Sequence, residues 1–294
     1  MDASDLKVFE AVARTGGMGR AAAELNTVQS NVTARVRALE DGLGAVLFVR
    51  HSRGVSLSPA GRRLLPYAIK VTLLLAEARR AVVDDGEPRG PLILGSLETA
   101  SALRLPRILA AFSTTCPAVD LTLVTGTSAE LIDQVLGAKL DGAFVAGPVR
   151  HPELAEELMF REELVLLTAP RMRGWGDLAG ERDLKLIVFR AGCSYRQRLE
   201  AMLAERGIVG LRRMEFGTLD GILGCVAAGI GVTMLPRAVV SPDWLALLAM
   251  HDLPHGEGSA DTVFIHRPDA FVTSALTAFL KFARPKAIER MAAE

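Results

Sequence analysis

MGRAAAELNTVQSNVTARVRALEDGLG, which spans residues 18–44, is the stretch that decides the fold of the amino-terminal part of this chain. Its second half predicts a helix over residues 28–41, because apolar residues recur at the i, i+4, i+7 and i+11 positions. These residues are Val32, Val36, Leu39 and Leu43. The first half predicts a preceding helix, and Asn26-Thr27 predicts the turn and the N-cap between the two. We therefore expect two short helices joined by a tight turn.

The solvent-facing side of the second helix carries groups that suit nucleic acid. Amide and guanidinium groups can bond a base edge with two hydrogen bonds, and small side chains let the backbone approach a groove. Such residues occupy this face and its flanks: Gln29, Ser30, Asn31, Thr33, Ala34, Arg35 and Arg37. The acids Glu40 and Asp41 lie at the far end, away from the turns that would enter a major groove. The pattern predicts a DNA recognition helix, with an ordinary amphipathic helical hairpin as the alternative.

The length and charge of the chain limit the class of protein to which it can belong. A chain of 294 residues, of which 50% are hydrophobic, can bury a large core and is long enough for two or three domains. Its formal net charge of zero argues against a general polyanion binder. Positive charge is nevertheless concentrated, because residues 28–63 hold six arginines against two acids. This concentration surrounds the predicted recognition helix, as expected for a nucleic-acid footprint.

The cysteines and the amino terminus predict a reduced, cytoplasmic protein. Cys116, Cys193 and Cys225 are widely spaced and include no CxxC pair, which argues against a metal centre or a disulfide framework. The amino terminus, MDASDLKVFEAV, has acids where a secretory signal has a basic region. No run reaches the roughly 18 apolar residues of a membrane span. We expect no membrane partner, no metal and no cofactor.

The elements on either side complete a DNA-binding domain. Residues 4–14 predict a first helix with Ser4 as its cap. Residues 47–61, LFVRHSRGVSLSPAG, contain two β-prone runs that flank the segment 51–54. A ribbon with Arg53 near its tip is suited to lie along a phosphate backbone as a wing. An unspecialised surface hairpin is the alternative.

Taken together, these motifs resemble the amino-terminal winged helix-turn-helix of LysR-type transcriptional regulators. The resemblance covers roughly residues 5–65 and rests on AAAELN, TVQSNVTARVRALEDGLG, LFVR and the Ser-x-Ala-Gly turn at 58–61. It implies a homodimer or homotetramer that binds double-stranded operator DNA and responds to a small molecule. One departure is Val28, because the family commonly has Ser or Thr just before the glutamine.

The resemblance also implies which residues contact DNA. Groove contacts carry over to Gln29, Ser30, Thr33 and Arg35, and backbone and wing contacts carry over to Arg50 and Arg53. Arg37 joins this group because it lies on the same outer arc of the predicted helix. We take residues 1–60 as the winged helix-turn-helix domain.

A long helix follows, started by Ser58 as cap and Pro59 in the first turn. It is predicted to run to about Val83 and carries many apolar residues, so it requires a partner surface. In the LysR family this linker helix pairs with a second copy; packing on the same chain is the alternative. The polar, Gly- and Pro-containing segment 84–90 predicts a boundary. We therefore assign residues 61–88 to the linker helix and hinge.

Residues 89–294 predict an α/β effector domain. Strand-like and helix-like runs alternate, which indicates parallel βαβ units. The alternation restarts near residue 161, which predicts two Rossmann-like subdomains, residues 89–160 plus 266–294 and residues 161–265. Crossings near residues 160 and 263 would leave a cleft between them. This layout resembles the LysR effector domain, which is similar to a periplasmic binding protein.

Ligands of such folds lie beyond the carboxyl ends of parallel strands, next to helix N-termini. The polar side chains at these junctions are the candidate effector-binding residues: Ser96, Glu98, Thr99, Ser101, Thr127, Ser128, Cys193, Ser194, Tyr195, Thr218 and Asp220. A small carboxylate metabolite is the default effector, because hydroxyls and free N–H groups at helix starts make an anion site. Glu98 and Asp220 would oppose a bare anion and favour an amino-acid-like or amine-bearing effector instead. For each hydroxyl, simple helix capping is the alternative.

Two other functions were weighed against this one. Cys193 lies at a predicted helix start beside Arg190 and Arg196, which would lower its pKa and favour thiol-based redox sensing. It resembles the reactive cysteine of the family's peroxide sensors, but no resolving cysteine stands near Met202; a pocket role and plain packing stay open. An enzyme-like module is the last alternative. The chain has no HExxH, P-loop or GxSxG motif, and we assign no catalytic residue.

Overall fold

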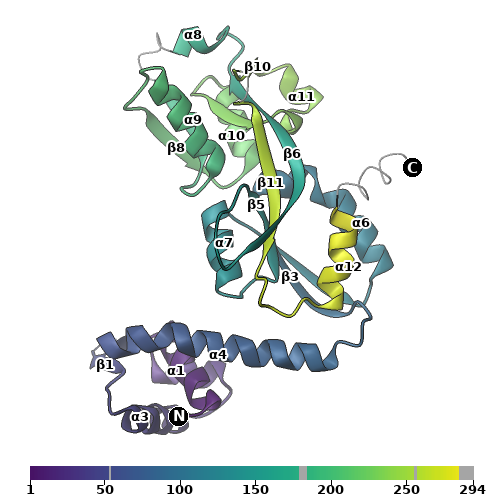
Figure 1. Ribbon diagram of the computed structural model, residues 1–294. Helices are drawn as coiled ribbons and strands as arrows, with labels where there is room; N and C mark the ends of the chain where they lie inside the picture. Colours follow the sequence, from purple (N-terminus) through teal and green to yellow (C-terminus); the bar gives the residue numbers. More distant parts are fainter. Residues whose placement is uncertain (53, 179–183, 255–256, 285–294) are drawn as a thin grey trace. The chain divides into compact units, whose positions relative to one another are not determined.

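The computed structural model describes residues 1–52, 54–178, 184–254 and 257–284. The chain divides into two compact units, Met1–Asp85 and Gly86–Glu294 (Figure 1). The division falls at the segment that the sequence marks as polar and rich in Gly and Pro. Among the described residues, no helix is both long enough and apolar enough to span a membrane.

The first unit contains the predicted helices and ribbon. Its elements are α1 (Ala3–Thr15), α2 (Met18–Glu24), α3 (Gln29–Leu43), β1 (Phe48–His51), β2 (Gly54–Leu57) and α4 (Pro59–Val83). Val32 and Leu39 of α3 are completely buried, and the ring of Phe9 from α1 lies 5.2 Å from that of Phe48. Leu43 was expected in this core, but it is exposed because α3 ends there and the chain turns at Gly44.

The caps of α1 and α3 differ from the predicted ones. Asp2, not Ser4, caps α1: its Oδ1 accepts from the N–H of Asp5 at 2.8 Å, and the Asp5 carboxylate accepts from the N–H of Asp2. The bond from the N–H of Asp5 favours the charged form of the Asp2 carboxyl and lowers the pKa of Asp2. The N-cap of α3 is Val28, which has no capping oxygen, rather than Thr27. Thr27 instead accepts a hydrogen bond from the side chain of Asn31.

Helix α4 begins as the sequence predicts. Ser58 Oγ accepts from the N–H of Gly61 at 3.0 Å, and Pro59 occupies the first turn. The helix extends well beyond the rest of its unit (Figure 1). It exposes large apolar side chains: Tyr67, Val71, Leu74, Leu75, Val82 and Val83.

The second unit is an α/β structure. Its first elements are β3 (Gly90–Ser96), α5 (Glu98–Leu103), α6 (Leu105–Thr115), β4 (Val119–Thr125), α7 (Ser128–Leu136), β5 (Gly142–Ala146) and β6 (Ala155–Thr168). The next are α8 (Trp175–Leu178), β7 (Lys185–Phe189), α9 (Ser194–Glu205), β8 (Arg212–Phe216), α10 (Leu219–Ala227), β9 (Thr233–Pro236) and the 3-10 turn η1 (Arg237–Val239). The last are α11 (Pro242–Leu245), β10 (Ala249–Asp252), β11 (Ser259–His266) and α12 (Ser274–Ala283).

The strands are only partly parallel. β3 pairs in parallel with β4 and β5, and β7 pairs in parallel with β8, as predicted. The main sheet has the order β10-β6-β11-β5-β3-β4, with β9 also on β6, and the pairs of β6, β10 and β11 are antiparallel. The parallel pairing indicated by the alternation therefore does not extend to β6, β9, β10 and β11.

The two halves of this unit are joined by β6 and β11. These strands pair over most of their length, from Ser259 opposite Glu163 to His266 opposite Ala155. Their register shifts between Thr262 and Val263, close to the predicted crossings. In Figure 1 both strands run from one half into the other. Each half buries its own apolar side chains.

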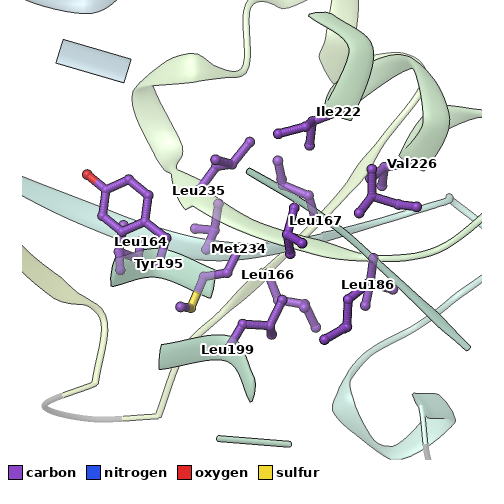
Figure 2. Close-up of a cluster of buried hydrophobic side chains, with 14 of the residues drawn as sticks. Leu164, Leu166, Leu167, Leu186, Tyr195, Leu199, Ile222, Val226, Met234 and Leu235 are labelled. Carbon is purple, nitrogen blue, oxygen red and sulfur yellow. The ribbon is translucent and has the colours of Figure 1, made fainter. Parts of the chain in front are cut away.

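The core of the second half is drawn in Figure 2. Aliphatic side chains from β6, β7, α9, α10 and β9 pack together there, including Leu166, Leu186 and Leu199. Tyr195 lies at the edge of this cluster with its hydroxyl directed away from the aliphatic groups (Figure 2). The polar end of Tyr195 is therefore available for contacts outside the core.

Two short helices follow β3 in place of one continuous helix: α5 ends at Leu103 and α6 begins at Leu105. Pro106 explains the break, because proline disfavours helical geometry at the preceding residue and suits the first turn of a new helix. The short elements α8, α11 and β10 had no counterpart in the sequence prediction.

Candidate nucleic-acid interface and ligand pocket

The outer face of α3 presents the predicted groove residues. Gln29, Ser30 and Arg37 are exposed, and within the described part of the chain their side chains make no hydrogen bond or ion pair. Thr33 is half-buried and its hydroxyl donates to the carbonyl of Gln29 at 2.9 Å. The amide of Gln29 lies over Gly19 of α2, where a Cβ would come within 3.1 Å of Gln29 Oε1. The face is thus open and positioned by α2.

Arg35 is directed elsewhere. Its guanidinium lies 3.0 Å from the carboxylate of Asp5 and 4.0 Å from that of Asp2, both at the start of α1. It therefore ties α3 to α1 and is not brought together with the other predicted groove residues. A groove contact by Arg35 would require this ion pair to open.

The ribbon has the geometry of a wing. Arg50 is exposed on β1, opposite Val55 of β2. Arg53, the predicted tip contact, lies outside the described residues. The ribbon is fixed to the turn after α1, because the N–H of Val55 donates to the carbonyl of Gly16 at 3.1 Å. Gly54 has a φ of +134°, and a Cβ there would lie 2.5 Å from that carbonyl oxygen, so a side chain would displace the wing.

Arg20 is a cation at this surface that the sequence reasoning missed. Its Nε donates to the carbonyl of Thr15 at 2.6 Å. The guanidinium lies against the turn, since a Cβ at Gly17 would come within 3.3 Å of its Cζ. The side chain is exposed and borders both the α1–α2 turn and the wing. Its place depends on the tertiary approach of the ribbon, which no local pattern shows.

The second unit contains a pocket at the ends of its parallel strands. It encloses about 520 Å³, including its open mouth. Six of the eleven predicted effector residues line it: Glu98, Thr99, Thr127, Cys193, Ser194 and Tyr195. They come from the β3–α5, β4–α7 and β7–α9 junctions, so both halves of the unit contribute. The strand-end rule therefore located a real concavity, and the binding role of these residues stays a prediction.

The other five predicted residues do not line the pocket. Two hydroxyls bond the backbone instead: Ser96 Oγ donates to the carbonyl of Leu97, and Ser128 Oγ accepts from the N–H of Ala146. Thr218 caps α10 by accepting from the N–H of Gly221, the capping alternative noted above. Ser101 and Asp220 lie outside the lining, one on α5 and the other on α10.

The reasoning from polar side chains missed most of the apolar and backbone wall. The additional lining residues are Leu97, Thr125, Gly126, Glu130, Phe189, Arg190, Phe216 and Gly217. They lie in the same junction regions, within four residues of a predicted residue. Phe189 and Phe216 could have been predicted from the sequence, because each is the last residue of its strand. The strand-end rule applies to an apolar side chain at that position as well as to a hydroxyl.

Tyr195 connects the pocket to the crossing strands. Its hydroxyl lies close to the side chains of Thr99 on α5 and Thr262 on β11, beside the register shift. Burial raises the pKa of Tyr195 to about 12, so the phenol is neutral at physiological pH. A neutral phenol of the pocket wall therefore lies beside residues of α5 and β11.

The surroundings of Cys193 differ from those expected. Burial raises the pKa of the Cys193 thiol, and the nearby N–H groups of Arg196 and Tyr195 and the Arg196 charge offset this only in part. Arg196 bonds Glu200 at 3.2 Å and Glu215 at 2.7 Å, so its charge is shared with two carboxylates. The predicted lowering of this pKa was wrong.

Cys193 should accordingly react slowly with iodoacetamide in the native protein at neutral pH. A buried thiol with a raised pKa holds little thiolate, which is the nucleophile. Peptide-resolved mass spectrometry should find it labelled at least about tenfold more slowly than the same cysteine in urea-unfolded protein. Labelling as fast as in the unfolded chain would contradict the buried environment.

The chain matches two family models. Residues 3–62 match the bacterial regulatory helix-turn-helix protein of the lysR family, and residues 85–287 match the LysR substrate binding domain. It is 41% identical over 280 residues to the HTH-type transcriptional regulator GltR of Bacillus subtilis, covering 95% of each chain. It is 39% identical over 282 residues to the HTH-type transcriptional regulator SoxR of an Arthrobacter strain, covering 96% of each.

Solved structures share the fold. Full-length CbnR complexed with its target DNA is 25% identical, covers 99% of this chain and 100% of its own, and superposes with a TM-score of 0.63. A full-length OxyR variant from Pseudomonas aeruginosa is 22% identical, covers 100% of this chain and 94% of its own, and has a TM-score of 0.65.

Proposed function

The chain belongs to the LysR family of DNA-binding transcriptional regulators, and we propose that it reads an operator through α3 and the wing while its pocket senses a small metabolite. The observation that carries this proposal is the outer face of α3. There, Gln29, Ser30 and Arg37 are exposed, and among the described residues their side chains make no hydrogen bond or ion pair. The relatives that the chain matches are named as transcriptional regulators rather than enzymes.

We assign the groove contacts to Gln29, Ser30, Thr33 and Arg37, and the backbone contact to Arg50. Gln29 and Arg37 can each make two hydrogen bonds to a base edge, whereas Ser30 and Thr33 allow close approach. Arg50 projects from a ribbon of the kind that lies along phosphates. Arg35 and Arg53 remain proposals, the first because Asp5 holds it and the second because it lies outside the described residues.

The oligomer is proposed to form through α4. Its exposed Tyr67, Leu74, Leu75, Val82 and Val83 make an apolar surface that a single copy leaves in water. A second α4 would cover these side chains and bring two DNA-binding units together, which suits a partly palindromic operator. We propose a dimer or tetramer acting in the cytoplasm, the compartment that holds the chromosome in bacteria.

Regulation is proposed to act through closure of the pocket. The two halves of the second unit meet around it, and a ligand that binds the closed arrangement more tightly shifts the population toward closure. Across a dimer, such a shift would change the spacing of the DNA-binding units. The thiol alternative has less support because the Cys193 thiol is buried and its pKa is raised.

Gln29→Ala should reduce discrimination between the operator and a mixed-sequence duplex. A lost two-bond base contact is worth about 1–3 kcal/mol, or about 5- to 150-fold in the affinity ratio. Arg50→Ala should instead weaken binding to both duplexes and lower the slope of log affinity against log salt by about one. Fluorescence anisotropy with the upstream intergenic fragment and a scrambled duplex measures both effects.

Lys139→Ala serves as the matched control, because it also removes one exposed cation but from the second unit. It should leave affinity, specificity and salt slope unchanged. If Gln29→Ala and Arg50→Ala gave the same profile, the assignment of base reading to α3 would fail. No binding of wild type to the intergenic fragment would overturn the proposed function itself.

A further inference from the structure

The pocket is lined by a carboxylate and a guanidinium, one from each half of the unit, that do not pair with each other. Glu98 is the first residue of α5, and Arg190 follows β7 in the other half of the unit. Within the described part of the chain, neither side chain makes a hydrogen bond or an ion pair with another residue, although the charge of Arg190 acts on Glu130 of the same pocket. A negative and a positive group thus line one concavity, each available to a ligand.

From this arrangement we propose that the effector is a zwitterion of the α-amino-acid type, with its ammonium on Glu98 and its carboxylate on Arg190. The inference deepens the proposed function and rests on it, since it names the ligand class of the same pocket. A guanidinium is matched in shape to a carboxylate, which it can bind with two parallel hydrogen bonds.

The second pocket acid, Glu130, is already occupied. Its carboxylate accepts from the N–H of Thr127 at 2.9 Å and from the hydroxyl of Thr127 at 3.0 Å. These hydrogen bonds, the backbone one first, lower the pKa of Glu130, and the charge of Arg190 adds to them. Glu130 is therefore a fixed negative charge within reach of Arg190 rather than an open ligand group. Glu98 is left as the carboxylate that can take an ammonium.

The formal charge of the wall selects against simpler ligands. Two carboxylates and one guanidinium give a net charge of minus one among the lining residues. A bare carboxylate would satisfy Arg190 but leave Glu98 unpaired as the pocket closes, and a bare amine would leave Arg190 unpaired. Only a ligand with both charges pairs both groups.

The first turn of α9 does not replace Arg190 as the anion site. The thiol of Cys193, which precedes the helix, lies close to the N–H groups of Tyr195 and Arg196 without making a capping hydrogen bond. Arg190 lies against Gly217, and the missing side chain of this glycine leaves space beside the guanidinium. A Cβ at Gly217 would come within 3.4 Å of Arg190 Nη2. The carboxylate end of the ligand is thus assigned to the side chain of Arg190.

The rest of the wall fits the side chain of an amino acid. Leu97, Phe189 and Phe216 give the pocket an apolar surface, next to the hydroxyls of Thr99 and Thr125. An amino acid with an apolar side chain would place it against this surface, and burying that side chain adds to its affinity.

The test begins with a thermal-shift screen of full-length protein against the L-amino acids at millimolar concentration. A ligand that binds only the native state raises the unfolding temperature in a concentration-dependent way. The best amino acid is then compared with its N-acetyl form, its amide, and the matching carboxylic acid and amine without the second charge. We expect each blocked or truncated form to bind about tenfold to a hundredfold more weakly.

Two variants test which residue binds the ammonium and which binds the carboxylate of the ligand. Glu98→Gln should lose the preference for the free amino acid over its N-acetyl form but keep the preference over its amide. Arg190→Gln should show the opposite pattern. Glu153→Gln and Arg150→Gln, exposed residues outside the pocket lining, are the charge-matched controls and should behave as wild type.

The outcomes separate this inference from the proposed function. If a carboxylate without an amine, or an amine without a carboxylate, bound as tightly as the amino acid, the zwitterion would be excluded while the regulator assignment survived. Absence of any amino-acid binder would exclude it as well. The proposed function would fail on a separate observation, namely that the wild-type protein does not bind the operator in preference to a scrambled duplex.

Discussion

Arg104→Ala is expected to lower the free energy of unfolding of the second unit by about 3 kcal/mol. Arg104 stands at the break between α5 and α6, and two of its nitrogens each lie 2.8 Å from an oxygen of Glu162. Glu162 is on β6 at the crossing of the two halves and is 6% exposed. Removing the guanidinium would leave a buried carboxylate without its partner, which typically costs about 3–5 kcal/mol. We expect the lower end of this range of unfolding free energy because Arg104 is itself partly exposed.

Urea unfolding of the full-length protein measures this effect. Both tryptophans, Trp175 and Trp244, lie in the second unit, so their fluorescence follows that unit. The matched control is Arg161→Ala, which breaks an exposed pair with Asp261 on the adjacent strand. Exposed pairs contribute only about 0–1 kcal/mol. If the two variants lost equal stability, the buried ion pair would not stabilise the crossing as described.

A second comparison separates the lost partner from lost packing. Arg104→Met combined with Glu162→Met removes both charges and keeps most of the side-chain volume. Because an apolar pair can replace a buried ion pair with little loss, the double variant should recover much of the stability that Arg104→Ala loses. A double variant less stable than Arg104→Ala would contradict this explanation.

Local patterns in the sequence were sufficient for most of the first unit. The spacing of Val32, Val36 and Leu39 predicted both the buried side of α3 and, by exclusion, its outer face. Ser58 and Pro59 predicted the start of α4 because capping depends on a few adjacent residues. Where the prediction failed, as at Leu43, the side chain lay past the point at which neighbouring elements cover the helix.

Features that depend on distant segments could not be predicted in the same way. The directions of β6 and β11 follow from their pairing with each other, which a run of apolar residues does not specify. The reactivity of the Cys193 thiol likewise depends on residues that are not adjacent to it in the sequence. The adjacent arginines suggested an activated thiol, but Arg196 is shared with Glu200 and Glu215, and burial dominates. Part of the pocket wall was missed because backbone and apolar groups give no polar signature.

Gly61→Ala is expected to destabilise the first unit by about 3 kcal/mol and to weaken DNA binding. Gly61 lies in the first turn of α4, and a Cβ there would be 2.2 Å from the carbonyl oxygen of Leu47 and 2.9 Å from Leu57 Cδ2. That carbonyl also accepts from the N–H of Ser58 at 2.9 Å, so it cannot move without breaking the junction between the wing and α4. The sequence marked Gly61 only as part of a turn, whereas the structure shows that it is needed for close packing.

Gly42→Ala is the control for this substitution, because Gly42 is inside α3 and a Cβ there meets nothing within 4 Å. In an open helical position alanine should stabilise by about 1 kcal/mol. Hydrogen exchange of peptides from residues 3–83 should therefore quicken in Gly61→Ala and not in Gly42→Ala. The tryptophan unfolding transition of the second unit should stay unchanged in both. Since the displaced ribbon carries Arg50, operator affinity should fall only in Gly61→Ala; equal behaviour of the two variants would show that the close contact at Leu47 does not hold the wing in place.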